Sequence, residues 1–338
     1  MRLLVTGGAG FIGSEFVRLT LREHDADSVV VLDKLTYAGN ERNLDPVRDD
    51  QRFQFVHGDI CDRNIVSELA RATDVILNFA AESHVDRSLE TPGEFILTDV
   101  YGTFVLMEAA REARHERFVQ ISTDEVYGEV ITGRSVESDP MRPRSPYSAS
   151  KAGGELQVQA YCASYRFPAI VTRGSNTYGP YQYPEKIVPL FITNAIDGRP
   201  LPLYGDGRAV RDYLYVTDHC RGIDVALRKG TPGEAYNIGA GGQVDGLTVA
   251  DSILRLMNRP ASLKQFVQDR PGHDRRYALD SSKLCALGWS AATSFEKGLE
   301  ATVRWYKENE SWWRPLKSGE FWEFYRRNYK PAAPAAVS

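Results

Sequence analysis

The sequence predicts an α/β fold in which a doubly wound parallel sheet carries a smaller, mixed α/β substrate-binding region. Three observations predict it. Short apolar, β-branched runs recur along the first half of the chain, amphipathic stretches separate them, and a glycine-rich turn follows the first run. Buried parallel strands are apolar nearly throughout, and strands that alternate with helices form βαβ units.

The elements of the first half follow from this alternation. The predicted strands are residues 2–6, 28–33, 53–57, 75–79, 117–122 and 169–173. The predicted helices between them are residues 14–23, 63–71, 94–114 and 148–165, where apolar residues recur at helical spacing.

The pattern changes after about residue 176, where proline and glycine become frequent and strands are isolated. We expect strands at 201–204, 211–216 and 235–238, and helices at 249–257 and 296–309. The sequence therefore predicts a first domain over residues 1–175 and a second, mainly substrate-binding domain over 176–330, closely packed on the first. Residues 331–338 are rich in proline and alanine, and we expect a disordered tail there.

Composition excludes several classes of function. The chain has 338 residues and a formal net charge of −4, so it offers no broad basic field for nucleic acid or anionic membrane. No apolar run approaches the roughly 20 residues of a membrane span, and the N-terminus is unlike a secretory signal. The four cysteines are scattered, which argues against a disulfide scaffold or a metal site. We expect a cytoplasmic protein without metal.

The glycine-rich turn indicates a dinucleotide site. The motif G-x-G-x-x-G is formed by Gly8, Gly10 and Gly13, between a strand and a helix. Glycine is needed there because the backbone of this turn must come close to a pyrophosphate. Asp33 ends the next strand, where a carboxylate accepts hydrogen bonds from ribose hydroxyls and repels a 2′-phosphate. This combination favours a Rossmann-like sheet with NAD as the cofactor, although Lys34 could tolerate the phosphate of NADP.

A second pattern predicts the catalytic groups. Tyr147 and Lys151 are four residues apart, so on a helix they share one face, and an ammonium favours the phenolate that acts as a base. Thr123 supplies a hydroxyl at the end of the fifth strand. With the glycine turn, this order of Thr, Tyr and Lys resembles the extended short-chain dehydrogenases/reductases.

Asp124 and Glu125 follow Thr123 directly, and two carboxylates in different surroundings can divide the roles of acid and base. An acidic pair after a strand also occurs simply as a helix cap. The segment Ser122–Gly128 nevertheless resembles the catalytic strand end of the nucleotide-sugar 4,6-dehydratases. Further similar segments are 33–40, 80–88, 178–181, 184–186 and 269–274, so the resemblance extends from Met1 to about Tyr329.

The resemblance implies an internal redox dehydration. Tyr147, with Thr123 and Lys151, takes the proton of the sugar C4 hydroxyl while hydride passes to NAD⁺. Glu125 then removes the C5 proton, Asp124 protonates the departing C6 hydroxyl, and hydride returns to C6 while a proton returns to C5. The segments 33–40 and 269–274 favour dTDP-glucose as the substrate and dTDP-4-keto-6-deoxyglucose as the product.

The resemblance also implies two sets of binding residues. Those for the cofactor are Gly7, Gly10, Phe11, Ile12, Gly13, Asp33, Lys34, Leu35, Thr36, Asp59, Ile60, Phe79, Ala80, Ala81, Ser83, Thr98, Tyr147, Lys151 and Thr177. Those for the substrate are Ser83, Thr123, Asn176, Lys186, Ile187, Leu203, Tyr204, Arg211, Arg270 and His273. Two departures leave contacts open: Gly246 stands near where relatives often have Asn, and Thr177 stands where they carry other residues.

Several alternatives stay open at this point. A nucleotide-sugar 4-epimerase would keep Tyr147 and Lys151 but has no use for Asp124 and Glu125. Other dehydratase substrates are UDP-N-acetylglucosamine, CDP-glucose and GDP-mannose, and a non-enzymatic NAD sensor is a third class. Helices 94–114 and 148–165 are apolar on more than one face, and the resemblance implies a homodimer through them; the monomer's own sheet could equally cover both.

Overall fold

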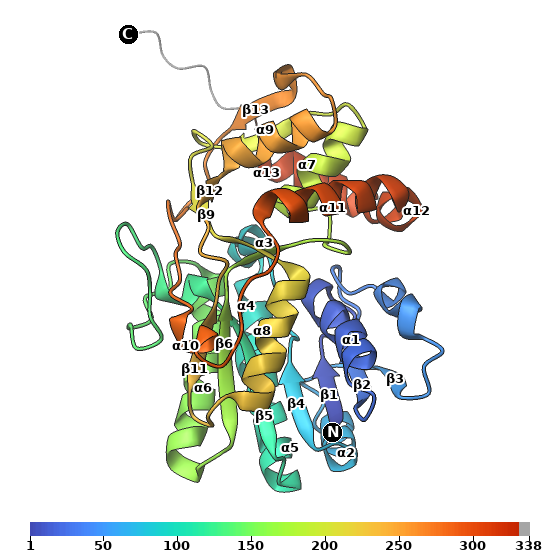
Figure 1. Ribbon diagram of the computed structural model, residues 1–338, viewed down its shortest axis with the longest axis vertical. Coiled ribbons are helices and arrows are strands. Elements are labelled where there is room, and N and C mark those ends of the chain that lie inside the picture. Colours follow the sequence, from blue (N-terminus) through green and yellow to red (C-terminus); the bar gives the residue numbers. More distant parts are fainter. Residues whose placement is uncertain (331–338) are drawn as a thin grey trace.

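The computed structural model describes residues 1–330 and is built on a seven-stranded sheet (Figure 1). Its strands, in spatial order, are β11 (Ala235–Ile238), β6 (Ala169–Gly174), β5 (Arg117–Thr123), β4 (Val75–Asn78), β1 (Arg2–Thr6), β2 (Ser28–Asp33) and β3 (Phe53–His57). Every neighbouring pair is parallel. The predicted doubly wound parallel sheet is therefore confirmed, because strand order reverses between β1 and β4.

Helices cover both faces of this sheet, which explains its apolar strands. On one face α1 (Phe11–Glu23) and α8 (Val216–Lys229) pack side by side over residues such as Leu3 and Val5. On the other, α2 (Arg63–Ala72), α5 (Thr103–Ala113) and α6 (Pro146–Tyr165) pack over residues such as Leu4. Successive strand residues point to opposite faces, so one continuous apolar run serves two cores.

The second region lies at the carboxyl end of the sheet (upper part of Figure 1). It comprises β8 (Leu201–Tyr204), β13 (Lys264–Val267), α7 (Ile187–Ile196), α9 (Gly246–Leu256), α11 (Phe295–Glu308), α12 (Glu310–Trp313) and α13 (Gly319–Asn328). Strands β8 and β13 pair in parallel, and the helices share a core rich in aromatic side chains.

Short elements complete the described chain. They are η1 (Glu41–Val47), α3 (Val85–Glu90), α4 (Pro92–Phe95), η2 (Ile96–Gly102), η3 (Asp124–Tyr127), β7 (Asn176–Tyr178), β9 (Val210–Arg211), β10 (Tyr213–Tyr215), β12 (Val244–Asp245), η4 (Ala261–Leu263), α10 (Ser282–Cys285) and η5 (Arg314–Leu316).

The chain returns to the first sheet after residue 176. Strand β11 pairs with β6, and α8 packs on α1, although both belong to the second half of the sequence. The division at residue 175 stays a prediction, and the tail predicted at 331–338 lies outside the described residues. No helix among residues 1–330 is long and apolar enough to cross a membrane.

Two predicted elements differ from the structure. The helix expected at 94–114 is interrupted by the π-helix η2, whose wider turn directs the Asp99 carboxylate toward Ser150 Oγ (2.6 Å). The strand expected at 211–216 divides into β9 and β10, and Val216 instead begins α8. Three described helices of ten or more residues were not predicted: α8, whose start reads as a strand; α7, which is apolar on nearly all sides; and α13.

Candidate active site

Two adjoining cavities lie at the carboxyl ends of the sheet strands, where parallel α/β sheets bind ligands. The first has a volume of about 300 Å³ and is lined by the glycine turn and by the ends of β2, β4, β5 and β6. The second, of about 190 Å³, lies between the first region, α7 and β8, and is also lined by Tyr329, which follows α13. Four residues line both cavities and mark where they meet: Glu125, Asn176, Glu185 and Lys186.

The glycine turn lets backbone segments pack closely where helix α1 begins, at the edge of the first cavity. Gly7 has φ of +69°, and a Cβ there would lie 2.5 Å from the Ala80 nitrogen. A Cβ at Gly13 would lie 2.4 Å from the Gly7 carbonyl oxygen, so helix α1 could not begin as close to β1. Gly10 is the N-cap of α1, whose free N–H groups face the first cavity in the arrangement that binds pyrophosphate.

The rim of the first cavity carries the residues expected to meet the adenosine ribose. Asp33 accepts hydrogen bonds from the backbone N–H groups of Ala9 (2.9 Å) and Leu35 (2.8 Å), which orients its carboxylate. Burial raises the pKa of Asp33, and these two hydrogen bonds oppose the rise. The Lys34 ammonium pairs with Asp59 (2.7 Å), so its charge is already partnered. This pairing favours NAD over NADP, because Lys34 is not a free cation for a 2′-phosphate.

The hydroxyl and amino groups predicted for catalysis meet at the end of β5. Tyr147 and Lys151 lie in the first turns of α6 and line the first cavity with Thr123. The Lys151 ammonium donates to the Ile121 carbonyl (2.8 Å) and is buried, which lowers its pKa. Burial raises the pKa of Tyr147 well above its ordinary value, and Glu125 adds to the rise. The lowering of the Tyr147 pKa that we expected from Lys151 is therefore not seen in the protein alone.

The two adjacent carboxyl groups have different surroundings. Burial, together with the neighbouring Glu125 charge, raises the pKa of Asp124 well above its ordinary range. Burial also raises the pKa of Glu125, but the cations Arg270, Arg211 and Lys186 oppose that rise. Asp124 is therefore set to hold a proton while Glu125 is set to ionise, as an acid and a base acting in sequence require.

The second cavity is lined by cations held by buried acceptors. Arg270 pairs with the buried carboxylate of Asp86 (3.3 Å), which also accepts a hydrogen bond from the Tyr204 hydroxyl (2.9 Å). The Arg211 guanidinium donates to the carbonyls of Val210 (2.8 Å) and Asp274 (2.9 Å) and stacks on a tyrosine ring. Guanidinium groups fixed in this way suit a diphosphate.

The predicted site residues converge on these cavities. All the predicted cofactor residues except Leu35 line the first cavity. Leu35 has φ of +54° and contributes its backbone N–H to Asp33 instead. Ser83 and Thr123 line the first cavity, and the other predicted substrate residues line the second. Gly246 also lines the second cavity, so only backbone borders the cavity at this position. Within residues 1–330 no cluster of His, Cys, Asp and Glu could hold a metal ion.

Several lining residues were not predicted, among them Glu82, Asp86, Glu185 and Tyr329. Glu82, whose pKa rises to about 7 through burial and the nearby Asp99 carboxylate, lines the first cavity. Glu185 is buried beside Arg87 (3.1 Å), and Asp86 supports Arg270. The acidic side chains in segments 80–88 and 184–186 were a usable signal for these three. Tyr329, which lines the second cavity, follows no motif.

Comparisons with known proteins agree with this geometry. The family model described as GDP-mannose 4,6 dehydratase matches residues 4–302. The dTDP-glucose 4,6-dehydratase of Streptomyces niveus is 49% identical over 323 residues, covering 94% of this chain and 96% of that protein. The low-salt glycan biosynthesis protein Agl12 of Haloferax volcanii is 52% identical, covering 90% of this chain and 98% of that one.

Solved structures show the same fold. The dTDP-glucose 4,6-dehydratase DesIV of Streptomyces venezuelae, determined with NAD bound, superposes with a TM-score of 0.92. It is 50% identical and the match covers 94% of this chain and all of that one. With the family model spanning most of the sequence and these relatives matching nearly end to end, the chain belongs to the nucleotide-sugar 4,6-dehydratase family.

Proposed function

We propose that the protein is a dTDP-glucose 4,6-dehydratase that uses NAD to form dTDP-4-keto-6-deoxyglucose for deoxysugar biosynthesis. The observation that carries this proposal is the position of Asp124 and Glu125. Both carboxyl groups line the first cavity beside Tyr147, and Glu125 also faces the second cavity with its three cations. A sugar bound across the two cavities places its reacting carbons between the hydroxyl base and this acidic pair.

The first step is oxidation at C4 of the sugar. The Tyr147 phenolate takes the proton of the C4 hydroxyl, and Thr123 holds the same oxygen. NAD⁺ held by the residues that line the first cavity would supply the hydride acceptor for C4 and, once reduced, the hydride donor for C6. A hydrogen bond with Thr123 opposes the rise in the Tyr147 pKa that burial causes. The positive charge of an oxidised cofactor in the first cavity would oppose it further.

The second step is elimination of water. The C4 ketone acidifies the C5 proton, which the ionised Glu125 removes. A proton returns to C5 when hydride adds at C6, which completes the 4-keto-6-deoxy sugar. Asp124, kept neutral by burial and by the Glu125 charge, protonates the C6 hydroxyl so that it leaves as water. A 4-epimerase has no elimination to perform, so this division of protonation states favours a dehydratase.

The substrate assignment is supported by the relatives. Proteins named dTDP-glucose 4,6-dehydratase are 49% and 50% identical to this chain over nearly its whole length. The predicted substrate ligands Lys186, Arg211 and Arg270 lie together in the second cavity, as a nucleoside diphosphate requires. UDP-N-acetylglucosamine, CDP-glucose and GDP-mannose are the competing substrates for the test below.

Turnover of dTDP-glucose deuterated at C4, without added reductant, tests the proposal. Deuterium at C6 of a 4-keto-6-deoxy product, measured by mass spectrometry and NMR, is the expected outcome, since hydride returns within one active site. Unchanged substrate would overturn the substrate assignment. Inverted configuration at C4 with no loss of water would favour the epimerase.

We also propose that the protein is a homodimer located in the cytoplasm. Large apolar side chains are exposed on neighbouring elements: Ile96 (53%) and Leu97 (58%) on η2, and Leu156 (52%) and Tyr165 (58%) on α6. These elements pack against each other, and an apolar patch of this kind indicates an interface. Sedimentation velocity of the protein and of Leu97→Glu tests it: the variant should sediment as a monomer.

A further inference from the structure

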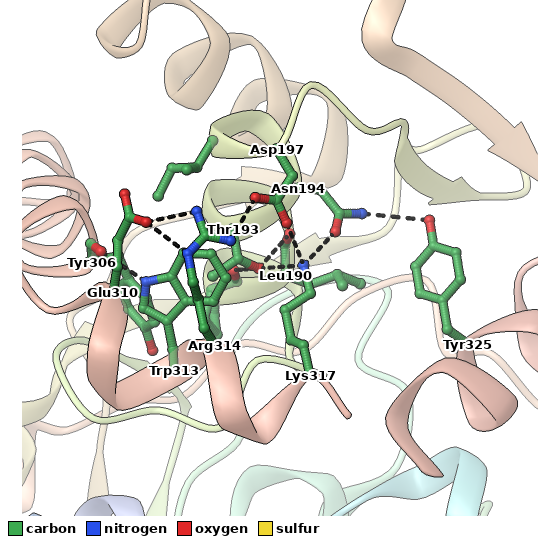
Figure 2. Close-up of polar contacts among 12 residues, drawn as sticks. Leu190, Thr193, Asn194, Asp197, Tyr306, Glu310, Trp313, Arg314, Lys317 and Tyr325 are labelled. Atoms are coloured by element: carbon green, nitrogen blue, oxygen red, sulfur yellow. Dashed lines mark hydrogen bonds and ion pairs between the residues drawn. The ribbon is translucent and has the colours of Figure 1, made fainter. Parts of the chain in front are cut away.

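A buried lysine lies outside both cavities, in the C-terminal segment. Lys317 follows η5, and only 3% of its side chain is exposed. Its ammonium donates to Asn194 Oδ1 (2.8 Å) and Thr193 Oγ1 (3.1 Å) and lies 3.9 Å from an Asp197 carboxylate oxygen (Figure 2). Burial of a charged group costs several kcal/mol. We therefore expect the Lys317 ammonium to have a role besides packing.

Aromatic rings surround the same ammonium. Its nitrogen lies 5.0 Å from the ring centroid of Trp322, 5.5 Å from that of Phe321 and 5.6 Å from that of Trp313. An apolar side chain of similar volume often stabilises such a site as well as a buried ion does. What a hydrogen-bonded ammonium adds is a defined geometry between the two elements that it joins.

Lys317 joins two helices, α7 and α13, and each has one end at the second cavity. Helix α7, which carries Thr193 and Asn194, begins with Ile187 at the cavity wall. Helix α13 follows Lys317 and is succeeded by Tyr329, which lines the same wall. Asn194 connects them, because its amide nitrogen donates to the Pro200 carbonyl (2.7 Å) and to the Tyr325 hydroxyl (3.4 Å), as Figure 2 shows for Tyr325.

A series of aromatic contacts continues from Tyr325 to the cavity. The ring of Tyr325 packs on that of Tyr329 with centroids 4.8 Å apart, and Tyr329 packs on Tyr204 at 5.4 Å. The Tyr204 hydroxyl donates to Asp86, the partner of Arg270. The Tyr329 ring is thus connected, through Tyr204 and Asp86, to the cation expected to meet the diphosphate.

We propose that Lys317 is a positioning residue for nucleotide binding, which fixes α13 on α7 and so holds Tyr329 in the wall of the second cavity. Tyr329 then supplies an aromatic surface to the nucleoside part of a nucleoside diphosphate. This inference rests on the proposed function, because it assigns the second cavity to the nucleotide of the substrate.

The test compares Lys317→Met and Tyr329→Leu with the unaltered protein. Calorimetric titration with dTDP should show binding weakened about tenfold in Tyr329→Leu, the loss of one stacked ring. Lys317→Met should weaken it about fivefold, through a displaced ring. The KM for dTDP-glucose should rise in parallel, while kcat and bound NAD change less than about twofold. The double variant should bind dTDP no more weakly than Tyr329→Leu alone, because both changes remove one contact.

Matched controls separate positioning from stability. Lys307→Met removes an exposed lysine of α11 and should leave dTDP binding unchanged, and Tyr329→Phe should retain most of it. Unchanged dTDP affinity in Lys317→Met, or additive losses in the double variant, would overturn the inference. If Lys317→Met does not fold, Tyr325→Leu decides, since it removes the ring between Asn194 and Tyr329; normal dTDP affinity in that variant also overturns the inference. An unaltered protein that neither binds dTDP nor dehydrates dTDP-glucose overturns the proposed function itself.

Discussion

The two cavities are built in different ways. The first is shaped by backbone: Gly7 and Gly13 allow backbone segments to lie close together, and two nearby N–H groups orient Asp33. The second is shaped by side chains from distant parts of the chain, such as Asp86 and Arg270, which are 184 positions apart. A backbone site follows from local sequence, whereas a site of paired charges exists only after the whole chain has folded.

The sharpest test of this contrast is Gly13→Ala. The added Cβ would lie 2.4 Å from the Gly7 carbonyl oxygen, so the turn must move. We expect loss of bound NAD and a fall in turnover of about a thousandfold or more, because displacement of the reacting groups by about 1 Å costs about a hundredfold by itself. Cofactor content after purification measures it. Gly93→Ala, where the Cβ meets nothing within 4 Å, is the control.

Glu125 lies where the two cavities meet, and Glu125→Gln tests its role as the base for the C5 proton. The amide cannot remove the C5 proton, but Tyr147 can still oxidise C4, so reduced cofactor should accumulate on the enzyme. Turnover should fall by about 10²–10⁴-fold, the usual contribution of a general base. Absorbance of enzyme-bound NADH after mixing with dTDP-glucose measures the accumulation, and normal turnover would show that Glu125 is not the base.

Arg270→Met alters the second cavity alone. It removes a cation from the expected diphosphate site and leaves the Asp86 carboxylate without its partner. We expect the KM for dTDP-glucose to rise about 10–100-fold, with bound NAD unchanged. Equal loss of NAD would mean that the two cavities are not independent. Asp86→Asn should produce a smaller rise, since Arg270 keeps its charge.

The smallest effect concerns pH and stability. Burial lowers the pKa of Lys317 from 10.5 to about 8, although Asp197 opposes this, while Arg199 and Arg314 add to it. Above about pH 8 the unfolded chain binds a proton that the folded protein has lost, so the free-energy cost of burying this group falls as the pH rises toward its unfolded pKa. Between about pH 7 and pH 9.5, the protein should gain roughly 1–2 kcal/mol relative to Lys317→Met. Urea unfolding of both proteins at the two pH values measures it, and parallel pH dependences would contradict it.

The same contrast explains what the sequence could predict. The sheet was predicted because each buried strand is a continuous apolar run, and the glycine turn because its motif is local. Arg211 and Arg270 were identified by resemblance, since no spacing indicates that residues so far apart share one cavity. The π-helix of Ile96–Gly102 and the helix α7 carry no periodic signal of their own. Tyr329 is placed by tertiary packing alone, as its contacts with Tyr204 and Tyr325 show.

The pairing of β11 with β6 limits how this enzyme can be recombined with its relatives. Strand β11 and helix α8 come from the second half of the sequence but complete the sheet that carries the glycine turn. A chimaera that exchanges everything after residue 175 therefore also replaces an edge strand and a covering helix of the nucleotide-binding sheet. Exchange of substrate preference between family members calls instead for separate transplants of the segments around α7–β8 and β13–α13, with residues 216–238 kept from the parent.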